Sequence, residues 1–506
     1  MNPESLQGIW NQMASDRSPI IRRAEEYAKL TLPKLMPPDG YDKADTDLVH
    51  DYQSIGAQAV NNLANKMMLA MFAPSRPFFR ISPTPEVKNA LAAQGIKEAD
   101  LLPRLGEEER NAVRRLDSLG QRPKLYAVMR HLIAIGNCLL VKEADSLRVM
   151  SLRYYCVKRD IRGRVKRLIT CENVCFNELD QEVQTQLRTK AAYKNKQDEK
   201  VSMYKLYDLT EDGKGYTVRQ AVDAEELPEK FKGRFSLADM PMLPLTWDLA
   251  DEHDYGTGLV EEYLNDFRAL SAISEATVDG GVLATEWRWL VNPSGQTTAD
   301  DLNKSKNGDA IPGSISDIAP TKGGDAQAVR VALEIDQHWE RRVAQGFLMT
   351  ANVIRDAERV TAEEIRRVAQ ELESSLGGVY SALASQIQRP IANWLLKGAG
   401  SDLTGTGMEL AIVTGLDALS RSGDLDSFDL ALSYLAKFSA MPEDLQMRFD
   451  YPTVVAFVGN GVGIDLAAMM KTKDQYEADL AAAAERRVAE QSATAAGNAI
   501  GATAAE

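Results

Sequence analysis

The sequence predicts a mainly α-helical protein that contains one β-rich, mixed α/β region. Apolar residues recur at helical spacing in the N-terminal third and in two long stretches, 256–283 and 326–347. Between residues 138 and 250 the pattern changes to short β-rich segments that are separated by turn residues. The 506 residues, 44% hydrophobic and 26% charged, have the composition of a globular protein with two to four domains.

The N-terminal part is predicted to be helical. Residues 4–32 form a helix that is interrupted near Pro19 and ends before Pro33, because proline lacks the amide donor that a helix interior needs. Residues 52–73 form a second helix whose apolar face belongs to the core. Residues 106–136 form a helical stretch with a break at Pro123.

The region 138–250 is predicted to form strands joined by tight turns. A hairpin turn is expected at Arg162–Gly163, since glycine tolerates the backbone conformations that such turns require. The interval 181–200 is polar and is expected to form a surface helix inside this region.

Two long helices at 256–283 and 326–347 are predicted to form an antiparallel arm. Glu261 and Glu262 lie in the first turn of the first helix, where the helix dipole favours anions. At 1.5 Å per residue each helix would be about 33–42 Å long. Residues 284–325, rich in Gly, Pro, Ser, Asn and Asp, form a compact insertion between them with a strand-like segment at 287–291.

A charged loop leads into a strongly signalled helix at 361–397. Thr361 and Glu364 have the spacing of a capping box, and apolar residues then recur at helical spacing. Pro390 is expected to end or kink this helix. The preceding loop carries four charged side chains: Arg355, Asp356, Glu358 and Arg359.

The C-terminal part is predicted to be helical after a linker at 398–407. Short helices are expected at 416–438 and 442–458. The Ala-rich tail, 465–506, favours helix but has few large apolar side chains. Two interpretations stay open for it: a frayed terminus, or a helix that its neighbours in an oligomer hold in place.

The charge and the cysteines exclude some classes of protein. A formal net charge of −14 argues against a protein that coats nucleic acid, although it allows one that lets DNA slide past. Cys171 and Cys175 are a weak zinc signal, and buried thiols in a reducing cytoplasm are the favoured interpretation of all four cysteines. A signal peptide and a membrane span are not expected.

The sequence contains no motif of a common enzyme. It has neither a phosphate-cradling GxxxxGK[ST] loop nor HExxH, and its four histidines show no ligand spacing. The acidic cluster at 251–254 could hold a metal, but a solvated loop explains it equally well. We therefore expect no cofactor, no metal site and no catalytic residues.

Several segments along nearly the whole chain carry a family resemblance: 18–40, 52–81, 254–270, 290–295, 354–380, 414–426 and 460–465. Together, and in this order, they resemble one family, the portal (head-to-tail connector) proteins of short-tailed, podovirus-type phages.

The resemblance implies a subunit of a dodecameric ring at the unique capsid vertex, in the virion at the head–tail junction, assembled in the host cytoplasm. It implies the following parts: a wing at 1–255, with its mixed α/β part at 138–250; stem helices at 256–283 and 326–348; a clip at 284–325; a tunnel loop at 349–360; a long wing-to-crown helix at 361–397; a crown at 398–464; and a barrel helix or mobile tail at 465–506.

The resemblance also implies a passive channel for double-stranded DNA during packaging and ejection. The terminase large subunit, and later tail adaptor or nozzle proteins, would dock at the clip, and major capsid and scaffolding proteins would surround the ring. The implied channel residues are Val353, Arg355, Asp356, Glu358 and Arg359. Two alternatives stay open: a scaffolding or minor capsid protein without a channel, and a soluble enzyme.

Overall fold

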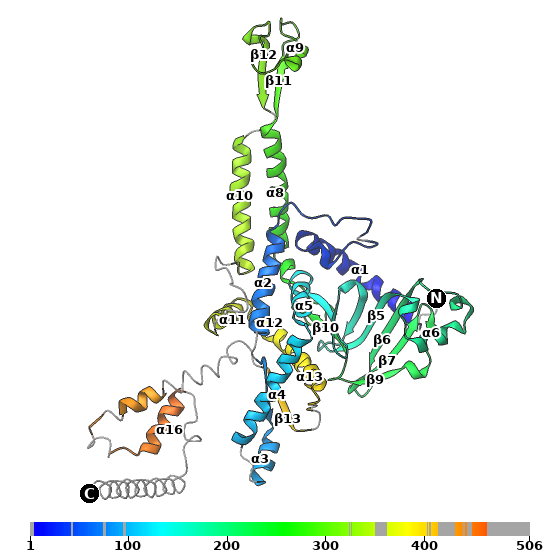
Figure 1. Ribbon diagram of the computed structural model, residues 1–506, viewed down its shortest axis with the longest axis vertical. Helices are drawn as coiled ribbons and strands as arrows, with labels where there is room; N and C mark the ends of the chain where they lie inside the picture. Colours follow the sequence, from blue (N-terminus) through cyan, green and yellow to red (C-terminus); the bar gives the residue numbers. More distant parts are fainter. Residues whose placement is uncertain are drawn as a thin grey trace, which may run out of the picture. The chain divides into compact units, whose positions relative to one another are not determined.

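The computed structural model describes residues 5–41, 44–73, 77–94, 98–322, 324, 326–349, 362–401, 403, 406–412, 431–438, 441–442 and 448–462. The chain divides into two compact units, Met1–Gly415 and Leu416–Glu506. Figure 1 labels the elements of both units, which are described separately below.

The N-terminal helices differ from the prediction at one proline. Helix α1 (Leu6–Leu30) begins at Ser5, whose hydroxyl accepts a hydrogen bond from Gly8 N at 3.1 Å, and it continues through Pro19 without interruption. Its residues on both sides of Pro19 are buried, and this packing outweighs the cost of about 3 kcal/mol for an interior proline. Helix α2 (Ile55–Met71) confirms the predicted second helix, and a short 3₁₀ turn, Pro33–Leu35, precedes it.

Helices α3 (Pro85–Ala93), α4 (Glu98–Ser118) and α5 (Arg122–Ile135) follow. The predicted break at Pro123 is confirmed, because Pro123 lies in the first turn of a new helix. Gly136 ends α5 with a φ of 81°. A Cβ atom there would lie 2.4 Å from Gly258 N, so the close approach of these two segments also requires glycine.

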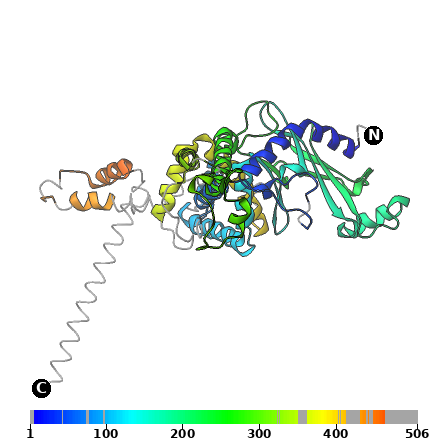
Figure 2. The same ribbon diagram turned by 90° about the horizontal axis from the view of Figure 1, so that it is seen from above.

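Two antiparallel sheets make up the β-rich region. A three-stranded sheet has the order β10 (Met242–Thr246), β2 (Asn137–Lys142), β3 (Leu147–Met150). The larger sheet consists of β4 (Tyr155–Arg159), β5 (Val165–Cys175), β6 (Lys200–Leu209), β7 (Gly215–Val222) and β8 (Glu225–Glu226), with β9 (Gly233–Ser236) paired to β7. Helix α1 packs on this sheet, where Leu6 and Met13 join one apolar cluster with strand residues (Figure 2).

Two local predictions in this region have different outcomes. The turn at Arg162–Gly163 is confirmed, since Gly163 has a φ of 76° between β4 and β5. The surface helix at 181–200 is shorter than predicted: α6 covers Gln181–Arg188, and a 3₁₀ turn covers Ala191–Tyr193. Val183 and Leu187 pack with Phe176 and Tyr193 in a separate small core, which fixes this segment on the sheet.

The predicted antiparallel arm is present, with one correction. The first helix does not run continuously over 256–283, because the short α7 (Leu259–Glu262) ends at Tyr263 before α8 (Leu264–Thr285) begins. Helices α8 and α10 (Ala326–Gly346) lie side by side (Figure 1). At their tip, β11 (Trp287–Val291) and β12 (Ile318–Lys322) form a hairpin-like pair that also carries α9 (Ala299–Lys304).

The prediction of one continuous helix over 361–397 is wrong. The helical run consists of α11 (Ala362–Leu376), α12 (Gly378–Leu383), a π-helical turn (Ala384–Gln388) and α13 (Arg389–Gly398). Gly377 breaks the run with a φ of 53°. Pro390 does not end it, because Pro390 lies in the first turn of α13, where its missing amide donor costs little.

Strand β13 (Met408–Ile412) follows the predicted linker and pairs antiparallel with β1 (Phe79–Pro83). It therefore belongs to the first unit, although the predicted crown began at 398. In the second unit a helix at 431–438 and α16 (Tyr451–Val462) contact each other through Ala431 and Val455. Residues 413–430, 443–447 and the tail 463–506 lie outside the described residues.

Candidate connector site

The predicted channel residues themselves lie outside the part of the chain that the structure describes. These are Val353, Arg355, Asp356, Glu358 and Arg359, together with the predicted cap Thr361. The structure does define both ends of this segment, at the exit of α10 and in α11. The site can therefore be built from the stem, its tip and these two ends.

An aromatic cluster anchors the lower end of the stem. Phe347 is fully buried, and its ring makes edge contacts with Tyr263 and Phe267 at centroid distances of 5.6 Å. Gly346 allows this approach, since a Cβ atom there would lie 2.5 Å from the Tyr263 ring. Leu270 is also buried here, so the lower stem is part of the main core.

The chain leaves α10 through a strained turn. Met349 N donates to Ala344 O at 2.7 Å, and Leu348 N donates to Gln345 O at 3.1 Å, as in a helix end that closes on a left-handed residue. That residue is Leu348, with a φ of 53°. Glycine is usual at such a position, and a leucine there costs about 1–2 kcal/mol. Other contacts must therefore stabilise this exit.

Helix α2 supplies these contacts through two polar side chains one turn apart. Asn62 Nδ2 donates to the carbonyl oxygens of Phe347 and Leu348, each at 3.2 Å. Lys66 Nζ donates to Leu348 O at 2.7 Å and forms an ion pair with Glu371 Oε2 of α11 at 2.8 Å. Lys66 is only 3% exposed. The apolar face of α2 was predicted to lie in the core, but no role was predicted for Asn62 or Lys66, although two polar residues four apart in an apolar helix were a usable signal.

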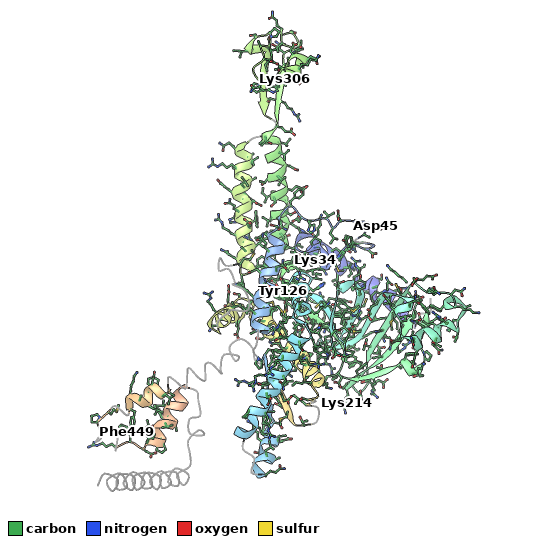
Figure 3. The ribbon with its side chains drawn as sticks, in the orientation of Figure 1. Lys34, Asp45, Tyr126, Lys214, Lys306 and Phe449 are labelled. Atoms are coloured by element: carbon green, nitrogen blue, oxygen red, sulfur yellow. The ribbon has the colours of Figure 1, made fainter. Side chains whose placement is uncertain are left out.

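The two stem helices are held in antiparallel register by polar pairs along their length. Arg342 forms an ion pair with Asp266 at 3.2 Å near the lower end. Further up, Ser274 Oγ donates to Asp336 Oδ1 at 2.8 Å. Side chains project from both helices away from this seam (Figure 3).

The upper stem exposes large apolar side chains on both helices. Their exposed fractions lie between 42% and 55% for these residues: Val278, Val282, Leu283, Val331, Leu333 and Ile335. Soluble monomers rarely expose apolar surface in contiguous patches, and such patches commonly mark protein–protein contacts. In the single chain each of these six side chains is about half exposed.

The tip of the stem, which we call the clip (residues 284–325), has buried polar side chains and exposes a few large apolar ones. The buried Asp317 carboxylate accepts hydrogen bonds from Gln296 N at 3.1 Å and Ser314 N at 3.3 Å. Ile315 is 96% exposed, and Trp289 and Leu290 are also exposed. Lys306 marks this tip in Figure 3. The clip thus needs little apolar core and can present apolar side chains outward.

One carboxylate of the acidic cluster considered for a metal, Asp254, has other partners. Asp254 accepts a hydrogen bond from Arg159 N at 2.7 Å and forms an ion pair with Lys158 at 2.9 Å. Within the described residues, His, Cys, Asp and Glu side chains form no group of three that could hold a metal ion. The four cysteines are free thiols, and burial raises the pKa of Cys156 to about 11. Across the same residues, no helix combines the length and apolar character needed to cross a membrane.

Comparison with known proteins defines the class of this chain. The family model of bacteriophage head-to-tail connecting proteins matches residues 4–470. The portal protein of Enterobacteria phage SP6 is 31% identical over 484 residues, which cover 94% of this chain and 92% of that protein. The portal protein of Escherichia phage T7 is 30% identical over 493 residues (94% and 90%), and that of Pseudomonas phage phiKMV is 31% identical over 483 residues (93% and 92%).

These matches are to phage portal proteins and to the family of head-to-tail connecting proteins. The chain belongs to the family of bacteriophage head-to-tail connecting proteins, and its role is that of a portal. The resemblance in the sequence is thereby confirmed at the level of the family.

Proposed function

We propose that this chain assembles into a closed dodecameric ring at the unique capsid vertex, as part of the virion at the head–tail junction. The exposed apolar surface of the upper stem is the observation that carries the proposal. In a ring, each stem would cover this surface on its neighbour, so that apolar area on every subunit is removed from water. Assembly would take place in the host cytoplasm, with major capsid and scaffolding proteins around the ring.

Within this ring the parts keep the roles expected from the family, with modified boundaries. The wing comprises residues 1–255 together with β13, because β13 pairs with β1. Helices α8 and α10 form the stem, 284–325 the clip, and α11 to α13 connect wing and crown. The crown then begins after Ile412, and residues 465–506 form a barrel helix or a mobile tail.

The ring would act as a passive channel for double-stranded DNA during packaging and ejection. The segment 349–360 is the proposed tunnel loop, with Val353, Arg355, Asp356, Glu358 and Arg359 facing the channel. The described residues on either side of this segment support the proposal, since Lys66 donates to Leu348 O at the exit of α10 and pairs with Glu371 of α11. The net charge of −14 would limit adhesion of DNA, while the two arginines contact phosphates without reading bases.

The clip is the proposed docking surface for the terminase large subunit and, after packaging, for tail adaptor or nozzle proteins. Ile315, Trp289 and Leu290 are exposed there and offer apolar contacts of the kind that anchor protein interfaces. Energy for DNA translocation would come from the terminase.

Assembly is tested with Ile335→Glu, which places a charge in the exposed apolar stem surface, and Gln337→Glu, an exposed position on the same helix, as its control. We expect Ile335→Glu to yield mainly unassembled chains and Gln337→Glu to yield closed rings, as counted by negative-stain microscopy. Normal rings from Ile335→Glu would contradict the stem interface. Extended or irregular assemblies from the unaltered protein would favour a scaffolding or minor capsid protein.

The channel loop is tested separately by replacing Arg355 and Arg359 with Ala. Ring formation and melting temperature should stay nearly unchanged, while packaging, retention or ejection of DNA changes in a salt-dependent, sequence-independent way. Thr361→Ala should do the reverse and destabilise the ring by about 1 kcal/mol through loss of a helix cap. A double-arginine variant that melts well below the unaltered ring, yet fills and holds DNA normally, would make these arginines structural.

A further inference from the structure

Lys66 contacts both elements that flank the segment 350–361. Its ammonium group donates to Leu348 O at 2.7 Å, where the chain leaves α10, and pairs with Glu371 of α11 at 2.8 Å. Residues 349–370 lie between these two partners along the chain. One side chain from α2 thus contacts the described elements on both sides of this segment.

The environment of Lys66 explains why both contacts matter. Its side chain is 4% exposed, and a buried ammonium is strongly destabilising unless carboxylate and carbonyl oxygens surround it. The carbonyl partner belongs to the C-terminal end of a long helix, where the helix dipole favours a cation. The carboxylate partner comes from another helix, so movement of either flank takes one oxygen partner away from a buried charge.

Asn62 allows the two flanks to be separated experimentally. Its side-chain amide donates to the carbonyl oxygens of Phe347 and Leu348, so these bonds stabilise the turn where the chain leaves α10. Glu371 supports only the attachment of α11 to Lys66. Lys66 is the residue of this group that joins the two.

We infer that Lys66 is a positioning residue that couples the exit of the stem to helix α11, so that the two ends of the segment 350–361 move together. The inference rests on the proposed function only where it concerns DNA, because the coupling itself depends on described contacts. In the assembled protein, a displacement of the stem exit would be transmitted to α11 through this ammonium group.

Hydrogen–deuterium exchange of the full-length assembled protein tests the coupling. In Lys66→Met, amides at 343–349 and at 367–376 should both exchange at least tenfold faster, while those of α5 at 122–135 stay unchanged. Asn62→Ala should affect only the first segment, and Glu371→Gln only the second. Lys124→Met, which removes an exposed lysine from α5, is the matched control and should change neither.

Faster exchange on one flank only would overturn the inference, and so would an equal increase in exchange throughout the unit Met1–Gly415. Either result would show that Lys66 is merely a buried structural lysine. If Lys66→Met fails to assemble, the double variant Asn62→Ala/Glu371→Gln takes its place. It should show faster amide exchange at both 343–349 and 367–376, and exchange that is not faster at both would overturn the inference.

A second readout separates this inference from the proposed channel. Heads assembled with Lys66→Met should lose packaged DNA at least threefold faster than heads with Lys124→Met. If exchange rises at both flanks while DNA retention is unchanged, the coupling stands and the assignment of 349–360 to the channel fails. If exchange does not rise at both flanks, the coupling fails whatever the DNA does.

Discussion

The lower and upper halves of the stem are built from the same two helices but have opposite surroundings. At the lower end, the apolar residues Phe267, Leu270, Val343 and Phe347 are buried within one chain. In the upper half, residues such as Val282 on α8 and Val331 on α10 are more than half exposed. The same apolar chemistry therefore stabilises the fold of the chain at one end and remains available for assembly at the other.

The difference follows from what surrounds each half. The lower stem packs against α2, whereas the upper stem, within the part of the chain that the structure describes, lies mainly against its partner helix, with the clip beyond it. Two helices can bury one stripe each against one another, and further apolar faces need additional partners. Changes in the lower half should consequently affect the single chain, and changes in the upper half should affect the ring.

The largest expected effect is that of Phe347→Ala. Removing a fully buried ring between Tyr263 and Phe267 should lower the free energy of unfolding by about 3–5 kcal/mol. Leu333→Ala, at an exposed upper position, should cost less than about 1 kcal/mol in the dissociated chain. Urea denaturation of dissociated chains measures both. Equal losses would remove the distinction between the two halves.

Acid should lower the free energy of unfolding of the chain through His131, a buried residue of α5. Burial lowers the pKa of His131 to about 4, below its usual value of about 6.5 in an unfolded chain. The unfolded state then binds the proton more readily, so the contribution is present above pH 6.5 and is lost as the pH falls towards 4, by about 3 kcal/mol in total. Denaturation at pH 7.5 and pH 5 should differ by about 2 kcal/mol from this group.

The variant His131→Gln should reduce that dependence on pH, whereas His338→Gln, at an exposed position on α10, should leave it unchanged. An unaltered slope in His131→Gln would mean that other groups cause the acid sensitivity.

Two glycines in the stem should respond to alanine with opposite signs. Gly346→Ala places a methyl group 2.5 Å from the Tyr263 ring and should destabilise the chain by about 1–3 kcal/mol. Gly281→Ala, in α8, meets no atom within 4 Å and should stabilise the helix by about 0.5–1 kcal/mol. Melting temperatures of the two variants, measured side by side, decide this. A stabilising Gly346→Ala would show that the contact with Tyr263 can relax.

The smallest expected effect on stability is at the clip. Ile315→Ser should change the free energy of unfolding by less than about 0.5 kcal/mol, because this side chain is almost fully exposed. Its effect on docking should be much larger, a loss of about tenfold in affinity for the tail adaptor. Titration of purified rings with the adaptor measures it. Unchanged affinity would place the docking surface elsewhere.

Much of the fold was predictable because it depends on local chemistry. Helix α2, the break at Pro123, the turn at Gly163 and the two stem helices follow from periodicity, proline and glycine, and they are present. The family was also predictable from the order of its similar segments.

The failures concern elements whose outcome depends on distant parts of the chain. Helix α1 continues through Pro19 because both of its halves pack elsewhere, and a sequence window contains no information about that packing. Strand β13 was not expected, since its partner β1 lies more than 300 residues earlier and pairing needs a three-dimensional edge. Gly377 breaks a helix whose apolar periodicity continues across it.

The sequence by itself determined the helical arm with its turn-rich insertion, the β-rich region and the membership in the portal family, because periodicity, turn residues and segment order are local or sequential properties. Only the tertiary structure decided which apolar residues are buried and which remain exposed along the stem, and that Asn62 and Lys66 reach Leu348 and Glu371. Burial and ion pairing depend on which elements meet in space, and residues hundreds of positions apart meet only after the chain has folded.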